Sequence, residues 1–225
     1  MGRRFDGILL MLPHKPHRRA SREITLDSWN LIRAGGGLAS ATAGILLLVG
    51  HVLNLGGDPV YGTVPGASSV LTAHVLLVFA LVALYAAQAE RSGVPGVLGM
   101  VLGVAGTTLV SGVVLVEMAG ASGANVEAVL GGGLAGTLAF LGGLAFFFGL
   151  ILFGAATMRA GVFPRWAGLL LIVGDVVFGA GDLFGPAAPI VYVLGAAITG
   201  AGFVWLGSAL FSGSGTSAQR PARVS

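Results

Sequence analysis

Six apolar runs, each of about 20 residues and almost free of charge, recur along this chain. A helix rises 1.5 Å per residue, so a run of this length crosses the roughly 30 Å hydrocarbon layer of a membrane. With 55% apolar and only 9% charged residues, a soluble globule is not expected. The sequence therefore predicts an all-α, polytopic membrane protein, a six-transmembrane-helix bundle with spans at 34–53, 70–89, 97–116, 134–156, 166–184 and 190–211.

The basic residues predict how this bundle is oriented. All twelve Lys and Arg lie outside the six runs. With six crossings they fall on one side of the membrane, and the loops on the other side contain none. Since cytoplasmic loops carry the excess of Lys and Arg, we expect both the N and the C terminus to be cytoplasmic.

The charge distribution also indicates partners and domains. The net charge of +3 arises from the cytoplasmic segments, so the expected partners are the lipid bilayer and, at the N-terminus, anionic lipid, with no nucleic acid. Residues 1–30 form a basic cytoplasmic N-terminal arm, residues 31–211 the transmembrane domain, and residues 212–225 a Gly- and Ser-rich cytoplasmic tail that we expect to be disordered.

One loop carries a recognisable turn. The stretch MRAGVFPRWAG, residues 158–168, is a short basic turn followed by a proline at a helix start. In this loop and in its general layout the chain resembles uncharacterised bacterial six-span integral membrane proteins, a resemblance that implies no known activity. Together with the preference for Arg over Lys, it indicates the plasma (inner) membrane of a prokaryote.

Four ionisable residues are predicted to lie on inward faces of different helices. In lipid, small residues identify the helix faces that pack, and at about 100° per residue His51 and Glu117 share such faces with glycines. The second span aligns His74 with other polar groups, and the fifth aligns Asp182 with glycines. Because successive spans alternate in direction, all four residues fall in one layer of the outer leaflet.

Two imidazoles and two carboxylates suit Zn²⁺ or a similar divalent ion. We therefore predict an outward-facing metal site whose ligands are His51, His74, Glu117 and Asp182, supported by Asn54, Tyr192 and, as a proton relay about 10 Å deeper, Asp175. The alternative for any group near the end of a span is simple hydration among the lipid headgroups. Asp175 lies near mid-span, where a carboxyl group is either protonated, paired or functional.

Several functions remain open at this point. The metal ion could activate water for hydrolysis of a lipid or another outer-leaflet substrate, or a haem could replace it between His51 and His74. A second hypothesis is a small proton- or ion-coupled carrier, in which Asp175 and Asp182 relay protons. A third is an accessory or assembly subunit of a membrane complex, packed through its glycine-rich faces on a partner or as a homodimer.

Overall fold

The computed structural model describes residues 17–58 and 60–213, with side chains from residue 28 onward. The predicted C-terminal tail and the first part of the predicted N-terminal arm lie outside these residues, apart from positions 212 and 213. The chain divides into two units, residues 1–31 and 32–225, and the description below concerns the second. Within the described part there is no strand, and the elements are α1 (His17–Asn54), α2 (Val64–Ala121), α3 (Glu127–Leu130), α4 (Gly133–Ala160), α5 (Arg165–Gly179), the 3-10 helix η1 (Gly181–Ala187) and α6 (Ala188–Phe211).

Four described helices are long and apolar enough to cross a membrane. They are Ser28–Asn54 within α1, Val64–Ala121, Gly133–Ala160 and the segment Gly181–Phe211, which comprises η1 and α6. Helices suit this environment because every backbone N–H and C=O is satisfied within the segment. The structure thus supports a multi-pass membrane protein built entirely of helices.

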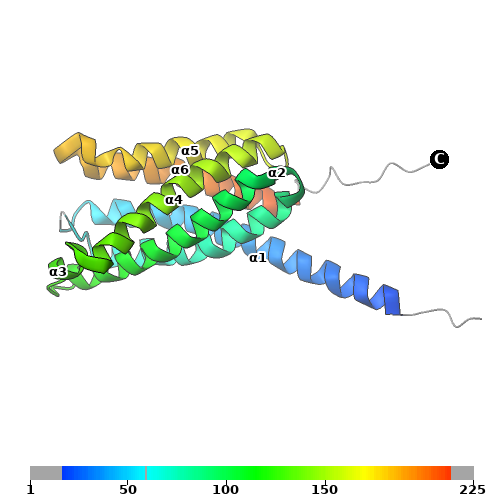
Figure 1. The fold of residues 1–225 in the computed structure, drawn as a ribbon, viewed down its shortest axis with the longest axis horizontal. Helices are drawn as coiled ribbons and strands as arrows, with labels where there is room; N and C mark the ends of the chain where they lie inside the picture. Colours follow the sequence, from blue (N-terminus) through cyan, green and yellow to red (C-terminus); the bar gives the residue numbers. More distant parts are fainter. Residues whose placement is uncertain (1–16, 59, 214–225) are drawn as a thin grey trace, which may run out of the picture. The chain divides into compact units, whose positions relative to one another are not determined.

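The 58-residue α2 is a helical hairpin rather than one rod (Figure 1). Gly93 interrupts it with φ 60° and ψ −160°, a conformation that is accessible essentially only to glycine. Residues before and after this turn meet across the two limbs: Leu81 lies against Gly103, and His74 bonds to Thr107. The two predicted runs at 70–89 and 97–116 are therefore antiparallel limbs that pack against each other.

Two helix boundaries differ from the sequence prediction. α1 begins at His17, so part of the predicted arm is helical and continuous with the first apolar run. The predicted run at 166–184 is divided, because α5 ends at Gly179 and the chain continues as η1. Gly185 at φ 52° and Pro186 interrupt regular helix there.

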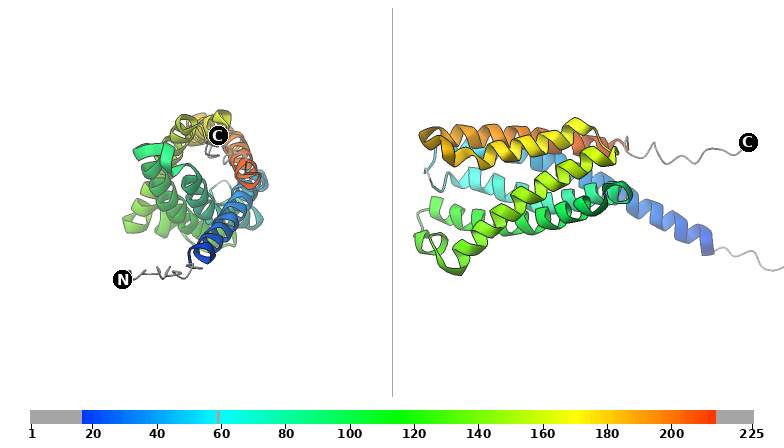
Figure 2. Two further views of the ribbon diagram at one scale, coloured as in Figure 1. Left: turned by 90° about the vertical axis from the view of Figure 1, so that its right-hand side faces the viewer. Right: turned by 45° about the horizontal axis from the view of Figure 1, so that its top comes forward.

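Glycines bring neighbouring helices into backbone contact. Gly44 of α1 and Gly200 of α6 face each other so closely that a Cβ on either would collide with the carbonyl oxygen of the other. Gly154 of α4 and Gly168 of α5 form a similar pair. Further close approaches join α1 to the first limb of α2 at Gly50, the second limb to α4 at Gly106 and Gly149, and α5 to α6 at Gly174 and Gly195. Contacts therefore lead from α1 around the bundle and back to α1 (Figure 2).

The larger hydrophobic core of the described residues lies towards the end of the bundle that carries the Gly93 turn. It includes the fully buried Leu81, Phe153, Phe203 and Leu206, with Leu77 near the middle of its helix. A smaller cluster, Ala67, Val70 and Val114, joins the two limbs of α2 at the opposite end. The opposite half contains the loop between α1 and α2. There the exposed carboxylate of Asp58 accepts hydrogen bonds from the amides of Tyr61 and Val60, which lower the pKa of that carboxyl.

Candidate functional site

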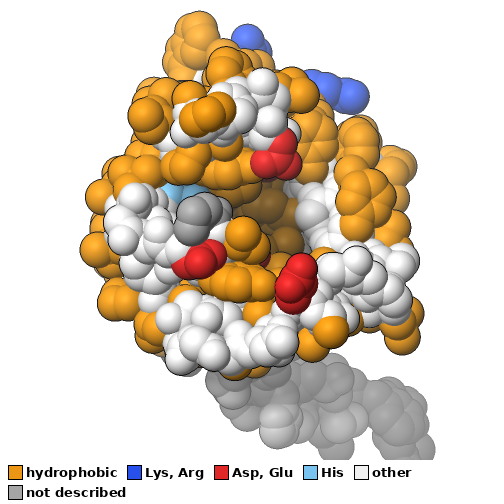
Figure 3. All heavy atoms as spheres, turned by 90° about the vertical axis from the view of Figure 1, so that its left-hand side faces the viewer, with side chains coloured by type: hydrophobic (Ala, Val, Ile, Leu, Met, Phe, Trp, Pro, Cys, Tyr) orange, Lys and Arg blue, Asp and Glu red, His pale blue; other side chains and the backbone are white. Residues whose placement is uncertain are grey.

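The half of the bundle away from the Gly93 turn holds a cavity of about 590 Å³, within the usual range for small-molecule sites. Figure 3 views the end that carries α3, where acidic side chains surround a hollow whose depth is hydrophobic. Residues from α1, both limbs of α2, α4, α5, η1 and α6 line the cavity; its polar members are His51, Asn54, His74, Glu117, Asp175, Asp182 and Thr199.

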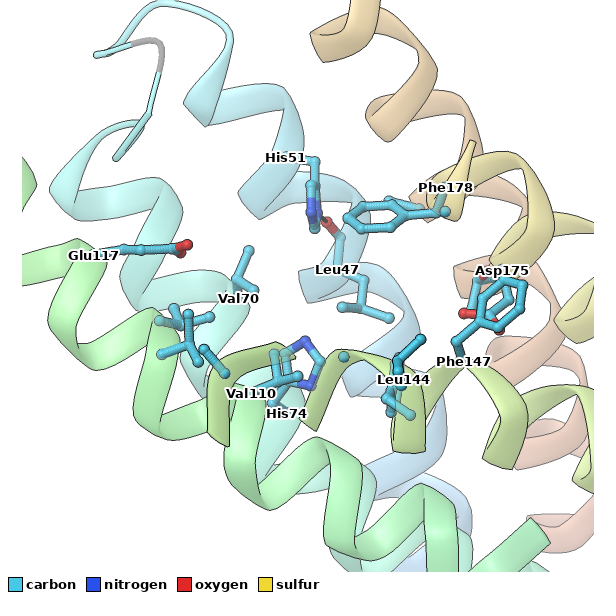
Figure 4. A pocket seen from close by; sticks show the side chains of 18 of the residues that line it. Leu47, His51, Val70, His74, Val110, Glu117, Leu144, Phe147, Asp175 and Phe178 are labelled. Atoms are coloured by element: carbon cyan, nitrogen blue, oxygen red, sulfur yellow. Dashed lines mark hydrogen bonds between the residues drawn. The ribbon is translucent and has the colours of Figure 1, made fainter. Parts of the chain in front are cut away.

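All four predicted ligands line this cavity, at different depths. Asp182 is exposed, His51 and Glu117 are half-buried, and His74 is only 5% exposed. In Figure 4, Glu117 and Asp175 enter from opposite sides, with His51 and His74 between them. The residues that the sequence predicted to share one layer therefore surround one space.

The hydrogen bonds of both imidazoles determine which ring nitrogen remains available. His51 Nδ1 lies 2.8 Å from the carbonyl oxygen of Leu47, which can only accept, so Nδ1 carries the proton. His74 Nδ1 lies 2.7 Å from the hydroxyl oxygen of Thr107. That hydroxyl donates its single hydrogen to the His74 carbonyl oxygen, so it too must accept from Nδ1. In both neutral rings Nε2 is therefore left as an acceptor.

Asp175 is the most unusual residue of the cavity. It is 5% exposed, and its Oδ2 atom is buried with no hydrogen-bond partner among the described residues. A buried ionised carboxylate without a partner is costly, especially in hydrocarbon. The side chain therefore must either keep its proton or meet a positively charged partner that the cavity can admit.

The predicted supporting residues have more local roles. Asn54 lines the cavity, but its Oδ1 accepts from the amide of Thr63, and Thr63 in turn caps α2 by accepting from Gly66 N. Tyr192 does not line the cavity. Its hydroxyl donates to the carboxylate of Asp182, so it holds this acid at the rim.

Aromatic rings connect these groups. Phe178 meets the His51 ring edge-to-face at 5.0 Å between centroids, and it also contacts the Tyr192 ring, again at 5.0 Å. Phe146 lies 5.2 Å from the His74 ring. Sequence reasoning missed these phenylalanines because an apolar residue in an apolar helix carries no signal of its own; their recurrence on the cavity side of α4 and α5 was the available clue.

The predicted metal centre has no support in the structure. No group of three or more His, Asp or Glu side chains in the described ranges could hold a metal ion. The physical reason is that the predicted ligands lie at different depths: His74 is buried and bonded to Thr107, whereas Asp182 is exposed and bonded to Tyr192. A zinc ion needs all its ligands within about 2.3 Å. Convergence on a cavity is a weaker condition than convergence on one ion.

The charges around the cavity are of one sign. None of the described arginines lines it. Arg91 precedes the Gly93 turn, Arg159 and Arg165 flank the junction of α4 and α5, and Arg33 lies beside Gly213 after α6. These four arginines lie near the Gly93 turn, the junction of α4 and α5 or the C-terminal end of α6, all away from the cavity. The cavity therefore presents carboxyl groups and imidazole acceptors without a compensating cation from the described residues.

Comparison with known proteins adds no functional assignment to this geometry. The chain matches no protein-family model, no curated protein and no solved structure.

Proposed function

We propose that this chain crosses the plasma membrane of a prokaryote six times, with both ends in the cytoplasm and the cavity open to the outside. The two limbs of α2 account for two crossings, α5 with η1 for another, and α1, α4 and α6 for the rest. The described arginines cluster at the helix ends away from the cavity, where the positive-inside rule favours the cytoplasm.

Single cysteines test this orientation directly, because the chain has no native cysteine. Ser122, after α2, and Ser212, after α6, are both exposed. In intact cells, a membrane-impermeant maleimide is expected to label the Ser122→Cys variant, and to label Ser212→Cys only after permeabilisation. Equal labelling of both variants in intact cells, or the reverse pattern, would overturn the orientation.

We infer that the protein is a proton-coupled carrier of a small cation. The observation that carries this inference is the unpaired, buried carboxyl group of Asp175 in a cavity open at one end. Such a carboxyl can exchange a proton for a cation, since either one removes the cost of its isolated charge. When the cation binds, the carboxyl releases its proton, and when the cation leaves, a proton returns.

Other titratable groups face the same cavity and take part in its charge balance. They are His51 of α1, His74 and Glu117 of α2, and Asp182 of η1. On the arginine side, the core that includes Leu77, Phe153 and Phe203 closes the bundle. A complete transport cycle requires this side to open while the outer side closes, as alternating access demands.

Proteoliposomes containing an internal pH dye test the coupling. After external addition of K⁺, Zn²⁺ or benzyltrimethylammonium, each in turn, at least one cation is expected to enter and drive protons out, so the internal pH rises. The rate of this pH change with the Asp175→Asn variant should fall to that of protein-free liposomes, because an amide cannot exchange a proton. Glu127→Gln, an exposed acid outside the cavity, serves as the matched control and should retain the flux.

The coupling is contradicted if none of these cations changes the internal pH, or if Asp175→Asn moves protons as fast as the wild-type protein. Flux of Zn²⁺ alone would retain the carrier and assign it an inorganic cargo.

A further inference from the structure

The titratable side chains that line the cavity offer acceptor atoms. Glu117, Asp175 and Asp182 supply carboxyl groups, and the Nε2 atoms of His51 and His74 are acceptors by the hydrogen-bond assignment above. No Lys or Arg of the described part lines the space. A ligand that satisfies this lining carries positive charge and donors, and an anionic ligand would face uncompensated repulsion.

The rest of the wall is apolar and aromatic. Leu47, Val70, Val110, Val113, Val114 and Leu144 contribute aliphatic surface, and four phenylalanines, Phe140, Phe146, Phe147 and Phe178, contribute rings. A hydrated inorganic ion gains nothing from such a wall, whereas an organic body displaces water from it favourably. The faces of aromatic rings also attract organic cations.

Charge is distributed along the depth of the cavity. Asp182 is exposed at the rim, whereas Asp175, seven residues earlier in α5, is only 5% exposed. Figure 4 shows Asp175 beside Phe147, with Phe178 towards His51. A cation attracted at the rim therefore finds a buried, unpaired carboxyl oxygen with aromatic rings next to it.

We propose that the ligand is a small amphiphilic organic cation, an alkylammonium or arylammonium, whose charged nitrogen binds the Asp175 carboxylate beside Phe147 and whose apolar body lies against the aliphatic and aromatic wall. This inference deepens the proposed carrier function and rests on it for its biological meaning. The binding site itself can be tested on purified protein without transport.

Calorimetric titration of the full-length, detergent-purified protein with three matched probes tests the site. The probes are 4-phenylbutylamine, which is cationic, 4-phenyl-1-butanol, which is neutral, and 4-phenylbutyrate, which is anionic. The amine is expected to bind at least about tenfold more tightly than the alcohol, since a charge-assisted bond to a carboxylate is worth more than that factor. The anion should show no binding.

Two variants and one control test whether the charged nitrogen of the amine binds at Asp175 beside Phe147. Asp175→Asn should reduce the affinity for the amine at least about tenfold, to the level of the alcohol, while leaving the affinity for the alcohol unchanged. Phe147→Leu keeps an apolar wall but removes the aromatic ring. This variant should lower the affinity for the amine about threefold or more without lowering the affinity for the alcohol. The Glu127→Gln control should bind the amine as the wild-type protein does.

Three results would overturn the inference: equal affinity for amine and alcohol, full amine affinity in Asp175→Asn, or stoichiometric Zn²⁺ binding that displaces the amine. If Asp175→Asn does not fold, the selectivity among the three probes and the Phe147→Leu variant decide the question. If the amine binds but no proton flux is seen, the organic-cation site is supported and the carrier function is contradicted. If K⁺ or Zn²⁺ drives proton flux but the amine does not bind, the carrier function is supported and the organic-cation site is contradicted.

Discussion

The Asp175→Leu variant is expected to be more stable than the wild-type protein when no ligand is present, and to lose cation binding. The carboxyl group is 5% exposed and one of its oxygens has no partner among the described residues. Insertion scales place the cost of Asp near the middle of a membrane helix at about 2.5–3.5 kcal/mol, and make Leu favourable there. We therefore expect a gain of about 2–3 kcal/mol, measured as a higher midpoint of thermal unfolding in detergent.

The matched control is Asp182→Leu. This acid is exposed and accepts a hydrogen bond from Tyr192, so its replacement should bring no gain. Addition of 4-phenylbutylamine at one hundred times Kd should stabilise the wild-type protein by about 2.7 kcal/mol and so raise its unfolding midpoint. The unfolding midpoint of Asp175→Leu should not change when the amine is added. A lower midpoint for Asp175→Leu would show that the carboxyl group stabilises the fold, and would remove the argument that it awaits a ligand.

This contrast separates a functional carboxyl from a structural one. Two uncharged buried polar groups of the bundle bond to other helices: Ser40 donates to the carbonyl oxygen of Phe203 at 2.7 Å, and Gln88 donates to Thr157 at 3.0 Å. Both bonds join different helices and are fully within the packed half. Gln88 Oε1 also lacks a partner among the described residues, but an amide carries no charge, so its burial costs far less than that of an ionised carboxylate. Asp175 has no such bond from Oδ2, and it lies where the packed half ends and the cavity begins.

The helical fold could be predicted from the sequence because lipid leaves the backbone few choices. Apolar runs of sufficient length become helices, and the short polar break around Gly93 separated two of them. The sequence did not reveal that α1 starts as early as His17, because backbone hydrogen bonds continue through polar residues and hydropathy marks no boundary there. Hydropathy also did not reveal the 3-10 geometry of η1, because Gly185 and Pro186 interrupt the helix within an apolar run.

The inward direction of the candidate site residues could be predicted from the sequence, but their separate depths and the distances between them could not. Helical periodicity assigned His51, His74, Glu117 and Asp182 to inward faces, and these residues line the cavity. Periodicity does not give the width of the space between helices, which decides whether the side chains could share an ion. It also cannot reveal the hydrogen bond from His74 to Thr107, since this bond requires the register of the two limbs of α2.

The width of that space depends on how closely the surrounding helices approach one another, and the contact between α1 and α6 is the clearest example. Replacement of Gly44 by valine is expected to destabilise the protein by about 3 kcal/mol, the upper part of the range for overpacked sites. Any side chain at Gly44 meets the backbone of Gly200 and the side chain of Val204. Backbone atoms cannot rotate away, so the two helices must separate.

The matched control is Gly112→Val, at an exposed helical position where a Cβ meets nothing within 4 Å. Valine is a slightly better helix former than glycine, so this variant should unfold within about 0.5 kcal/mol of the wild-type protein. The unfolding midpoints of both variants, measured in the same detergent, test whether the contact at Gly44 stabilises the protein.

If Gly44→Val were as stable as Gly112→Val, α1 and α6 would not be in backbone contact in the membrane, and the wall that carries His51 would not be fixed relative to Thr199 of α6. If only Gly44→Val is unstable and it also loses the preference for 4-phenylbutylamine over the alcohol, then glycine packing sets the geometry on which charge recognition in the cavity depends.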